Sequence, residues 1–375
     1  MKKFLVFTLL GSFLLVTTPA SAAIKVGDAC KKIGEIRSLN STKVTCTKVG
    51  KKSVWKSVSK PVIAVAKPTS FSNLVANYKG IPDSVWTDAS KYLAQNLSDE
   101  IKVTVEKGPN TNIRYANSEI EYGITRALKL GTNYPRQNKF LVVAFNFQDR
   151  DWAKTRLATI ESPFTLNDTF SDQVSVACSS LTECDNAFGN ISTDSGLITQ
   201  GVSGLNNASN TNSRVIRSHY AHETTHTIQK SIYKKYGLKR FSIPCWFSEG
   251  QPQAVATSAS SESLSQYILN RQNWLRPSLK GLPDFSEASI SKFFDLQHNQ
   301  PCDSATRMHI YDIGFIAVEA LVSIGGISST FEVLDKYASG MTFDVAFEKV
   351  YGISWTSAKP ILASVVSKQY IEANY

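Results

Sequence analysis

Hydrophobic residues follow two different periods in the first part of the globular region. Alternation over Ile101–Val105 predicts a strand, and the apolar run Lys139–Phe145 predicts a buried strand. A further strand is predicted over Gly196–Val202. A helical period predicts one helix over Asp83–Leu97, before the first of these strands, and another over Ser118–Leu130, between the first two. This part of the chain is therefore expected to mix strands with helices.

The second part of the chain has only the helical period. Three apolar stripes predict three helices: Ile310–Ile324, Ser328–Tyr337 and Thr342–Tyr351. We therefore predict an α+β domain over residues 71–375. It consists of a β-rich half, 71–211, followed by a helical half, 212–375.

The first 22 residues have the pattern of a secretory signal peptide. Lys2 and Lys3 precede an apolar stretch, Phe4–Val16, that is short for a bilayer span, and Ala20 to Ala22 form a small-x-small cleavage site. No later segment is long and apolar enough to cross a membrane. The sequence thus predicts a secreted or cell-surface protein without a transmembrane segment in the mature chain.

Residues 23–57 are predicted to form a small basic module with Cys, Gly and Trp, followed by a linker over 58–70. Between residues 24 and 69, eleven Lys and Arg stand against two acidic residues, whereas the rest of the mature chain is near neutral. The module either binds an anionic cell-envelope polymer or lipid, or serves as a solubilising spacer. Because the charge is confined to it, we expect no nucleic-acid partner.

Six cysteines in an exported chain favour three disulfides. Spacing suggests the local pairs Cys30–Cys46 and Cys178–Cys184, which leaves Cys245 and Cys302. Six cysteines allow fifteen connectivities, so this pairing is one of several. Metal ligation by cysteine is the alternative, although the chain has no C-x-x-C pair.

Two short motifs carry the candidate chemistry. His222, Glu223 and His226 belong to an H-E-x-x-H sequence, and Glu249 belongs to a W-F-S-E-G sequence. On a helix, residues four apart share a face, so both imidazoles can bind one zinc ion, with Glu223 beside it as general base. Asn212 or Ser213 can cap this helix and Gly237 can end it. Glu249 can supply the third ligand and leave a fourth position open.

The two motifs together resemble those of the gluzincin metallopeptidases, the thermolysin-like and aminopeptidase-like group. In that family the third ligand is a Glu on the next helix, often within W-x-x-E-G. The resemblance covers roughly residues 200 to 375. It implies a zincin-like catalytic domain that holds one zinc ion through His222, His226 and Glu249, with Glu223 as the base.

The resemblance also assigns supporting roles, with some departures. Thermolysin-like members have an acidic residue one turn after the Glu ligand to orient a ligand His, and here that position is Gln253. Pro252 fits the helix only if Glu249 lies in its first turn, with Ser248 as N-cap. The strand before the metal helix binds the substrate backbone at a sheet edge in the family. This points to Leu197 and Thr199, or else to an ordinary sheet strand.

Four further residues are weighed around the site. The resemblance favours Tyr311 as the donor to the oxyanion, with His309 as a second candidate, and either can be a packing residue instead. His219 lies one turn before His222 on the same face, where it either supports the site or contacts substrate, or is an ordinary helix residue. Glu319 lies in an apolar run, where it either orients a ligand His or faces solvent.

The sequence therefore predicts an exported zinc peptidase that acts on a peptide or protein substrate. Two alternatives remain open at this point. One is a non-catalytic envelope-binding protein whose basic module is the functional part. The other is a zinc hydrolase with a non-peptide substrate, because H-E-x-x-H does not itself specify a peptide.

Overall fold

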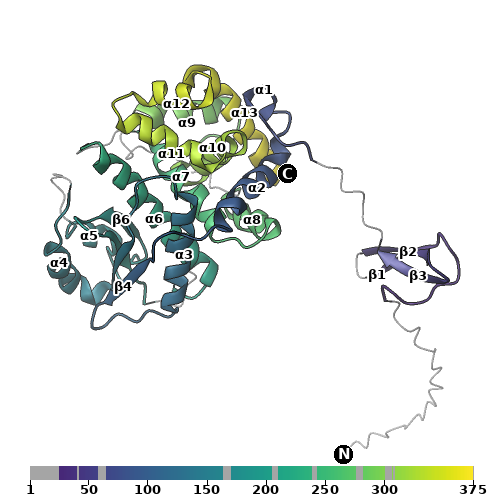
Figure 1. Cartoon of the computed structure of the whole chain (residues 1–375), viewed down its shortest axis with the longest axis horizontal. Coiled ribbons are helices and arrows are strands. Elements are labelled where there is room, and N and C mark those ends of the chain that lie inside the picture. Colours follow the sequence, from purple (N-terminus) through teal and green to yellow (C-terminus); the bar gives the residue numbers. More distant parts are fainter. Residues whose placement is uncertain are drawn as a thin grey trace, which may run out of the picture. The chain divides into compact units, whose positions relative to one another are not determined.

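The protein forms two compact units, Met1–Ala64 and Val65–Tyr375, in the computed structural model (Figure 1). The structure describes residues 25–39, 42–57, 65–163, 170–204, 210–238, 243–275, 282–299, 306 and 309–374. The predicted signal peptide and residues 58–64 of the predicted linker lie outside these ranges.

The first unit contains a three-stranded antiparallel sheet: β1 (Ile36–Leu39), β2 (Thr42–Val49) and β3 (Lys52–Ser57). Gly50 has φ +61° in the turn between β2 and β3, a left-handed conformation that favours glycine. The Cys30–Cys46 disulfide joins the segment before β1 to β2, and Val44 and Trp55 are buried beside it. The predicted disulfide-stapled β module is confirmed.

The second unit contains a four-stranded sheet with the order β4-β5-β7-β6. Its strands are β4 (Lys102–Lys107), β5 (Lys139–Phe145), β6 (Ala187–Ile191) and β7 (Gly196–Gly201). β4, β5 and β7 are parallel, and β6 folds back antiparallel on β7. The three strands predicted from the sequence are therefore present, and β6 is a fourth that the sequence analysis missed.

Helices cover both faces of this sheet: α3 (Asn117–Leu130), α4 (Arg150–Ala158), α5 (Gln173–Ala177) and α6 (Ser213–Lys235). Phe140 and Val142 of β5 pack in one core with α3 and α6, whereas Val143 and Phe145 pack in another with α4 and α5. The predicted mixture of helices and strands is confirmed, but the expectation of a β-rich half is wrong, because helices cover both faces of the small sheet. Parallel strands need crossover connections, and helices supply them here.

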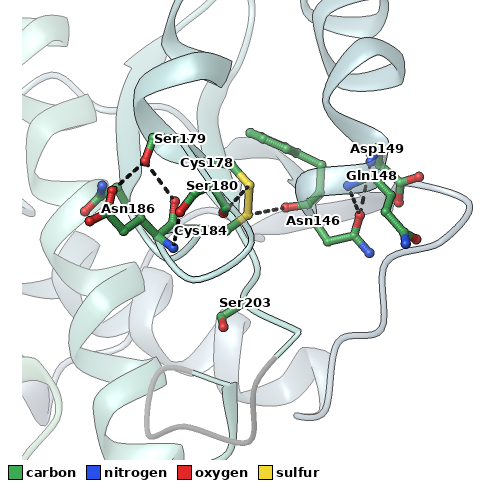
Figure 2. The surroundings of a disulfide bond; sticks show 12 residues. Asn146, Gln148, Asp149, Cys178, Ser179, Ser180, Cys184, Asn186 and Ser203 are labelled. Atoms are coloured by element: carbon green, nitrogen blue, oxygen red, sulfur yellow. Dashed lines mark hydrogen bonds between the residues drawn. A yellow bond between two sulfur atoms is a disulfide. The ribbon is translucent and has the colours of Figure 1, made fainter.

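Figure 2 shows the Cys178–Cys184 disulfide, which closes the short loop between α5 and β6. It lies next to the turn after β5, where the Asn146 side chain accepts hydrogen bonds from the backbone amides of Gln148 and Asp149. This disulfide confirms the second predicted pair. Cys245 is also disulfide-bonded, but its predicted partner, Cys302, lies outside the described residues.

The remaining described elements are all helical, and those after residue 212 agree with the predicted helical half. They are α1 (Phe71–Leu74), α2 (Ile81–Leu93), α7 (Cys245–Ala259), α8 (Leu264–Arg271), α9 (Glu287–Asn299), α10 (His309–Gly325), α11 (Ile327–Ala338), α12 (Phe343–Tyr351), α13 (Trp355–Asn374) and the 3-10 turns η1 (Tyr78–Gly80), η2 (Phe147–Asp149) and η4 (Gln272–Trp274). Over the described ranges, no single helix is long and apolar enough to cross a bilayer. α10 and α11 meet that criterion only as a pair bent by 102°.

Candidate metal centre

The H-E-x-x-H sequence lies on α6, whose ends have the predicted signals. The side chain of Asn212 caps the helix by accepting a hydrogen bond from the amide of Arg214 at 3.0 Å. Gly237 follows the last turn with φ +70°. The helix packs against α3, α7 and β6, so its middle is buried on several sides. Buried surroundings hold its side chains in defined positions.

Glu249 lies on α7, but this helix does not begin where we expected. It starts at Cys245 with Pro244 as N-cap, so Ser248 is not the cap and Pro252 lies in the helix interior. An interior proline leaves the carbonyl four residues earlier without its helical donor. Here that carbonyl belongs to Ser248, and it accepts a hydrogen bond from Nε2 of Gln229 at 3.1 Å. Tertiary structure thus supplies the partner that the helix lacks.

The three predicted ligands meet at one point. Nε2 of His222 lies 3.2 Å from Nε2 of His226 and 3.3 Å from Oε2 of Glu249, and Nε2 of His226 lies 3.2 Å from the same oxygen. Each residue directs one ligand atom into this cluster, which could hold a metal ion. The near-equilateral triangle brings together two helices whose ligands are more than twenty residues apart.

The Glu249 carboxylate interacts electrostatically with both imidazoles. Burial alone would raise the pKa of Glu249, but His226 and His222 hold it well below its ordinary value. Burial likewise lowers the pKa of His226, yet the Glu249 carboxylate outweighs this and leaves the pKa raised. The site therefore favours a positive charge among its ligands, which is the charge that a metal cation would supply.

Glu223 lines the same cavity as the three ligands, and its side chain is buried. The cavity has a volume of about 920 Å³. Residues of β6 also line the cavity, and a Cβ placed on Gly189 would lie 1.9 Å from the carbonyl oxygen of Glu223. Only glycine fits at this crossing, so β6 lies directly against the backbone of α6 beside Glu223.

The expectation that Leu197 and Thr199 form a substrate-binding edge is wrong. Both belong to β7, which pairs with β5 on one side and β6 on the other, and both are fully buried. A short turn between Ile191 and Gly196 folds β6 back onto the side of β7 that would otherwise be free. β6 is therefore the edge strand at the cavity.

Of the two oxyanion candidates, the structure brings only Tyr311 to the cavity. Its ring centroid lies 6.1 Å from that of His222. His309 is buried outside the cavity lining, where its ring packs near Phe293 and its Nδ1 lies 3.3 Å from Asp312. Both residues lie near the start of α10, where a separation of two residues directs side chains to different sides of a helix. The candidacy of His309 is not supported.

Of the other supporting residues, Glu319 lies outside the cavity lining, whereas His219 and Gln253 belong to it. Glu319 is fully buried, but it binds Arg271 through two hydrogen bonds of 2.7 Å and accepts another from Tyr267, so it does not orient a ligand His. His219 and Gln253 both line the cavity. Among the described residues, Nε2 of each lacks a hydrogen-bond partner, so neither contacts a ligand through that atom.

Sequence analysis missed two residues that follow His226 on α6. Oε1 of Gln229 lies 2.8 Å from Nδ1 of His226, and Nζ of Lys230 donates to the backbone carbonyl of Gly189 and to Asn190 on β6. Burial lowers the pKa of Lys230 to about 8. They follow His226 by three and four residues, so they lie near the same face of α6. This spacing could have indicated both residues from the sequence.

Comparisons with protein-family models, with curated proteins and with solved structures found no match.

Proposed function

We propose that this chain is an exported, zinc-dependent peptidase of the gluzincin type. The observation that carries the proposal is the triangle formed by His222, His226 and Glu249, open to a large cavity beside Glu223. Two imidazoles and one carboxylate with an open fourth position are the donor set of catalytic zinc sites, whereas structural sites use four protein ligands.

The distances within the triangle fit zinc. Tetrahedral zinc with bonds of about 2.0–2.1 Å separates its ligand atoms by about 3.3 Å. The three separations here are 3.2, 3.2 and 3.3 Å. The ligands thus already have the spacing that zinc requires, which supports zinc over the larger, oxygen-preferring calcium.

The surrounding residues supply the other parts of a hydrolytic site. Zinc, when bound, acts as a Lewis acid and lowers the pKa of a coordinated water. Glu223 would accept the proton of the attacking water and deliver it to the leaving amine. The hydroxyl of Tyr311 would donate a hydrogen bond to the oxygen of the scissile carbonyl as negative charge develops there.

The edge strand favours an extended peptide as substrate. In an antiparallel pair, alternate residues direct their backbone groups away from the partner strand. The amide of Gly201 donates to the carbonyl of Asn186, so the backbone groups of Asn186 face β7. One and three residues later, the amide and carbonyl groups of Ala187 and Gly189 therefore face the open side of β6. Both residues line the cavity. A substrate backbone can pair there by strand addition, with Ala187 as the main contact because Lys230 already binds the Gly189 carbonyl.

The small unit suggests how the enzyme is retained at a surface. Its exposed cations are Lys25, Lys31, Lys32, Arg37, Lys48, Lys51, Lys52 and Lys56. One of its two acidic residues, Glu35, is paired with Arg37. This excess positive charge supports binding to an anionic cell-envelope polymer as part of the proposal.

Zinc analysis and one substitution test the proposal. The purified mature protein should contain about one zinc per chain, and His226→Ala should lose it. Glu223→Gln should retain zinc but hydrolyse a peptide library about 100- to 10,000-fold more slowly. Glu121→Gln, an exposed residue of α3, is the matched control. Full activity in Glu223→Gln, or no zinc in the wild type after exposure to it, contradicts the proposal.

A further inference from the structure

The hydrogen bonds behind His226 determine which of its nitrogens carries a proton. Nδ1 of His226 lies 2.8 Å from Oε1 of Gln229. The amide group of Gln229 could in principle be turned the other way, with its nitrogen toward the imidazole. However, Nε2 of Gln229 lies 3.1 Å from the carbonyl oxygen of Ser248 and 2.9 Å from Oε1 of Gln251. Because a backbone carbonyl can only accept, the nitrogen must face Ser248.

This orientation leaves an oxygen facing His226, so Nδ1 must be the donor. A neutral imidazole with its proton on Nδ1 has its lone pair on Nε2. Nε2 is the atom that lies in the ligand triangle. Gln229 is itself 4 % exposed, so water cannot readily replace it as the acceptor.

The carbonyl that fixes Gln229 has no competing helical donor, because a proline stands four residues after it. In an uninterrupted helix, the Ser248 carbonyl would bind the amide of residue 252. Pro252 has no amide hydrogen, and the carbonyl is therefore free for Gln229. Gln251 gives the second support, since its Nε2 donates to Oγ1 of Thr330 on α11 at 3.0 Å.

We propose that Gln229 is a positioning residue for the metal centre and that Pro252 enables it by releasing the Ser248 carbonyl. Together they couple α6, which carries both histidine ligands, to α7, which carries Glu249. The inference rests on the proposed zinc site and adds to it a chain-specific support that replaces the acidic residue expected at Gln253. In this arrangement, an interior proline that costs its helix one hydrogen bond serves metal binding.

Zinc affinity of the full mature chain tests this directly, measured by competition with a chromophoric chelator. Gln229→Leu should bind zinc about 10- to 100-fold more weakly, the usual effect of removing a hydrogen-bond partner of a ligand histidine. Gln297→Leu is the matched control, because Gln297 is equally buried but lies on α9 away from the cavity. Its affinity should equal that of the wild type.

Pro252→Ala tests the second part and does not depend on the folding of the first variant. The substitution restores a backbone amide that competes for the Ser248 carbonyl, so zinc affinity should fall several-fold while the metal-free protein unfolds at the same or a higher temperature. A merely structural role of Pro252 would move both quantities together. In the double variant, Pro252→Ala should add no further loss to Gln229→Leu.

The outcomes separate the inference from the proposed function. If the wild type binds zinc and both variants bind it equally well, the inference is wrong and the zinc site stands. If the wild type binds no zinc, the proposed function fails as well. In the zinc-loaded wild type, the Nδ1 proton of His226 should exchange slowly with water by NMR, and Gln229→Leu should accelerate it. Equal exchange rates would also overturn the inference.

Discussion

Gly250 and Gly314 bring the backbones of α7 and α10 into direct contact. A Cβ on Gly250 would lie 2.3 Å from the carbonyl oxygen of Gly314, and a Cβ on Gly314 would lie 2.4 Å from that of Trp246. Glu249 immediately precedes one glycine, and Tyr311 lies one turn before the other. The close crossing therefore places Tyr311 beside His222, which gives a physical reason for the glycine after Glu249 and for the glycine one turn after Tyr311.

Substitution of Gly314 by alanine should separate the two helices. The added methyl group meets backbone rather than a flexible side chain, so we expect a loss of about 1–3 kcal/mol in the free energy of unfolding. Hydrolytic activity should fall with it, because Tyr311 moves relative to His222. Urea unfolding and peptide hydrolysis measure both effects. Gly204→Ala, where the added methyl group meets nothing within 4 Å, is the control. Wild-type stability in Gly314→Ala would contradict the predicted contact.

The hydroxyl of Tyr311 should matter for turnover and not for metal binding. Tyr311→Phe keeps the ring against His222 but removes the donor to the developing oxyanion. We expect kcat to fall about 100-fold, with the zinc content unchanged. Steady-state kinetics with a peptide substrate, beside metal analysis, check this. An unchanged kcat would assign Tyr311 a packing role only.

Glu319 should contribute to stability and not to the metal centre. Glu319→Gln breaks a buried ion pair and leaves Arg271 without its charge partner, so we expect a loss of about 3–5 kcal/mol in the free energy of unfolding. Zinc affinity, measured at a temperature where the variant is folded, should match the wild type. A selective loss of zinc affinity would instead return Glu319 to the role expected from the sequence.

The metal-free protein should lose stability as the pH rises above 6.5 through the raised pKa of His226. The folded-state pKa of His226 lies above its ordinary value of 6.5, so its stabilising effect is complete below pH 6.5 and disappears as the pH rises through the raised pKa. The lowered pKa of Glu249 acts in the opposite direction, because its contribution is present above pH 4.5 and is lost toward lower pH. Thermal unfolding in the presence of a chelator should therefore show that His226 and Glu249 stabilise the fold most between pH 4.5 and pH 6.5.

Zinc affinity should rise with pH over the neutral range, whereas the stability of the metal-free protein should fall. Zinc binds the neutral imidazole, so protons and metal compete for His226. Affinity should rise with pH until His226 is deprotonated, and the rise should extend above pH 6.5. In Glu249→Gln, the cause of the raised pKa is gone, and the apparent midpoint should move to lower pH. A pH-independent affinity between pH 6 and 8 would contradict the assignment.

Local pattern was sufficient for many elements of the second unit and for the three residues that the structure brings together as a possible metal site. The predicted helix Ser118–Leu130 matches α3 to within one residue, and Lys139–Phe145 matches β5. His222 and His226 share a face because residues four apart do so on every helix. Such predictions depend on residues near one another in the chain, and neighbouring residues interact in the same way in most folds.

Only the tertiary structure decided which partners those elements and side chains have. It placed β6 rather than β7 at the sheet edge, paired Glu319 with Arg271, and began α7 before Ser248. Each outcome depends on a contact between distant segments, and a strand or a buried carboxylate carries no local record of its partner. Pro252 illustrates this best. By sequence it indicates a helix start, yet a hydrogen bond from Gln229 on another helix satisfies the carbonyl that it leaves free.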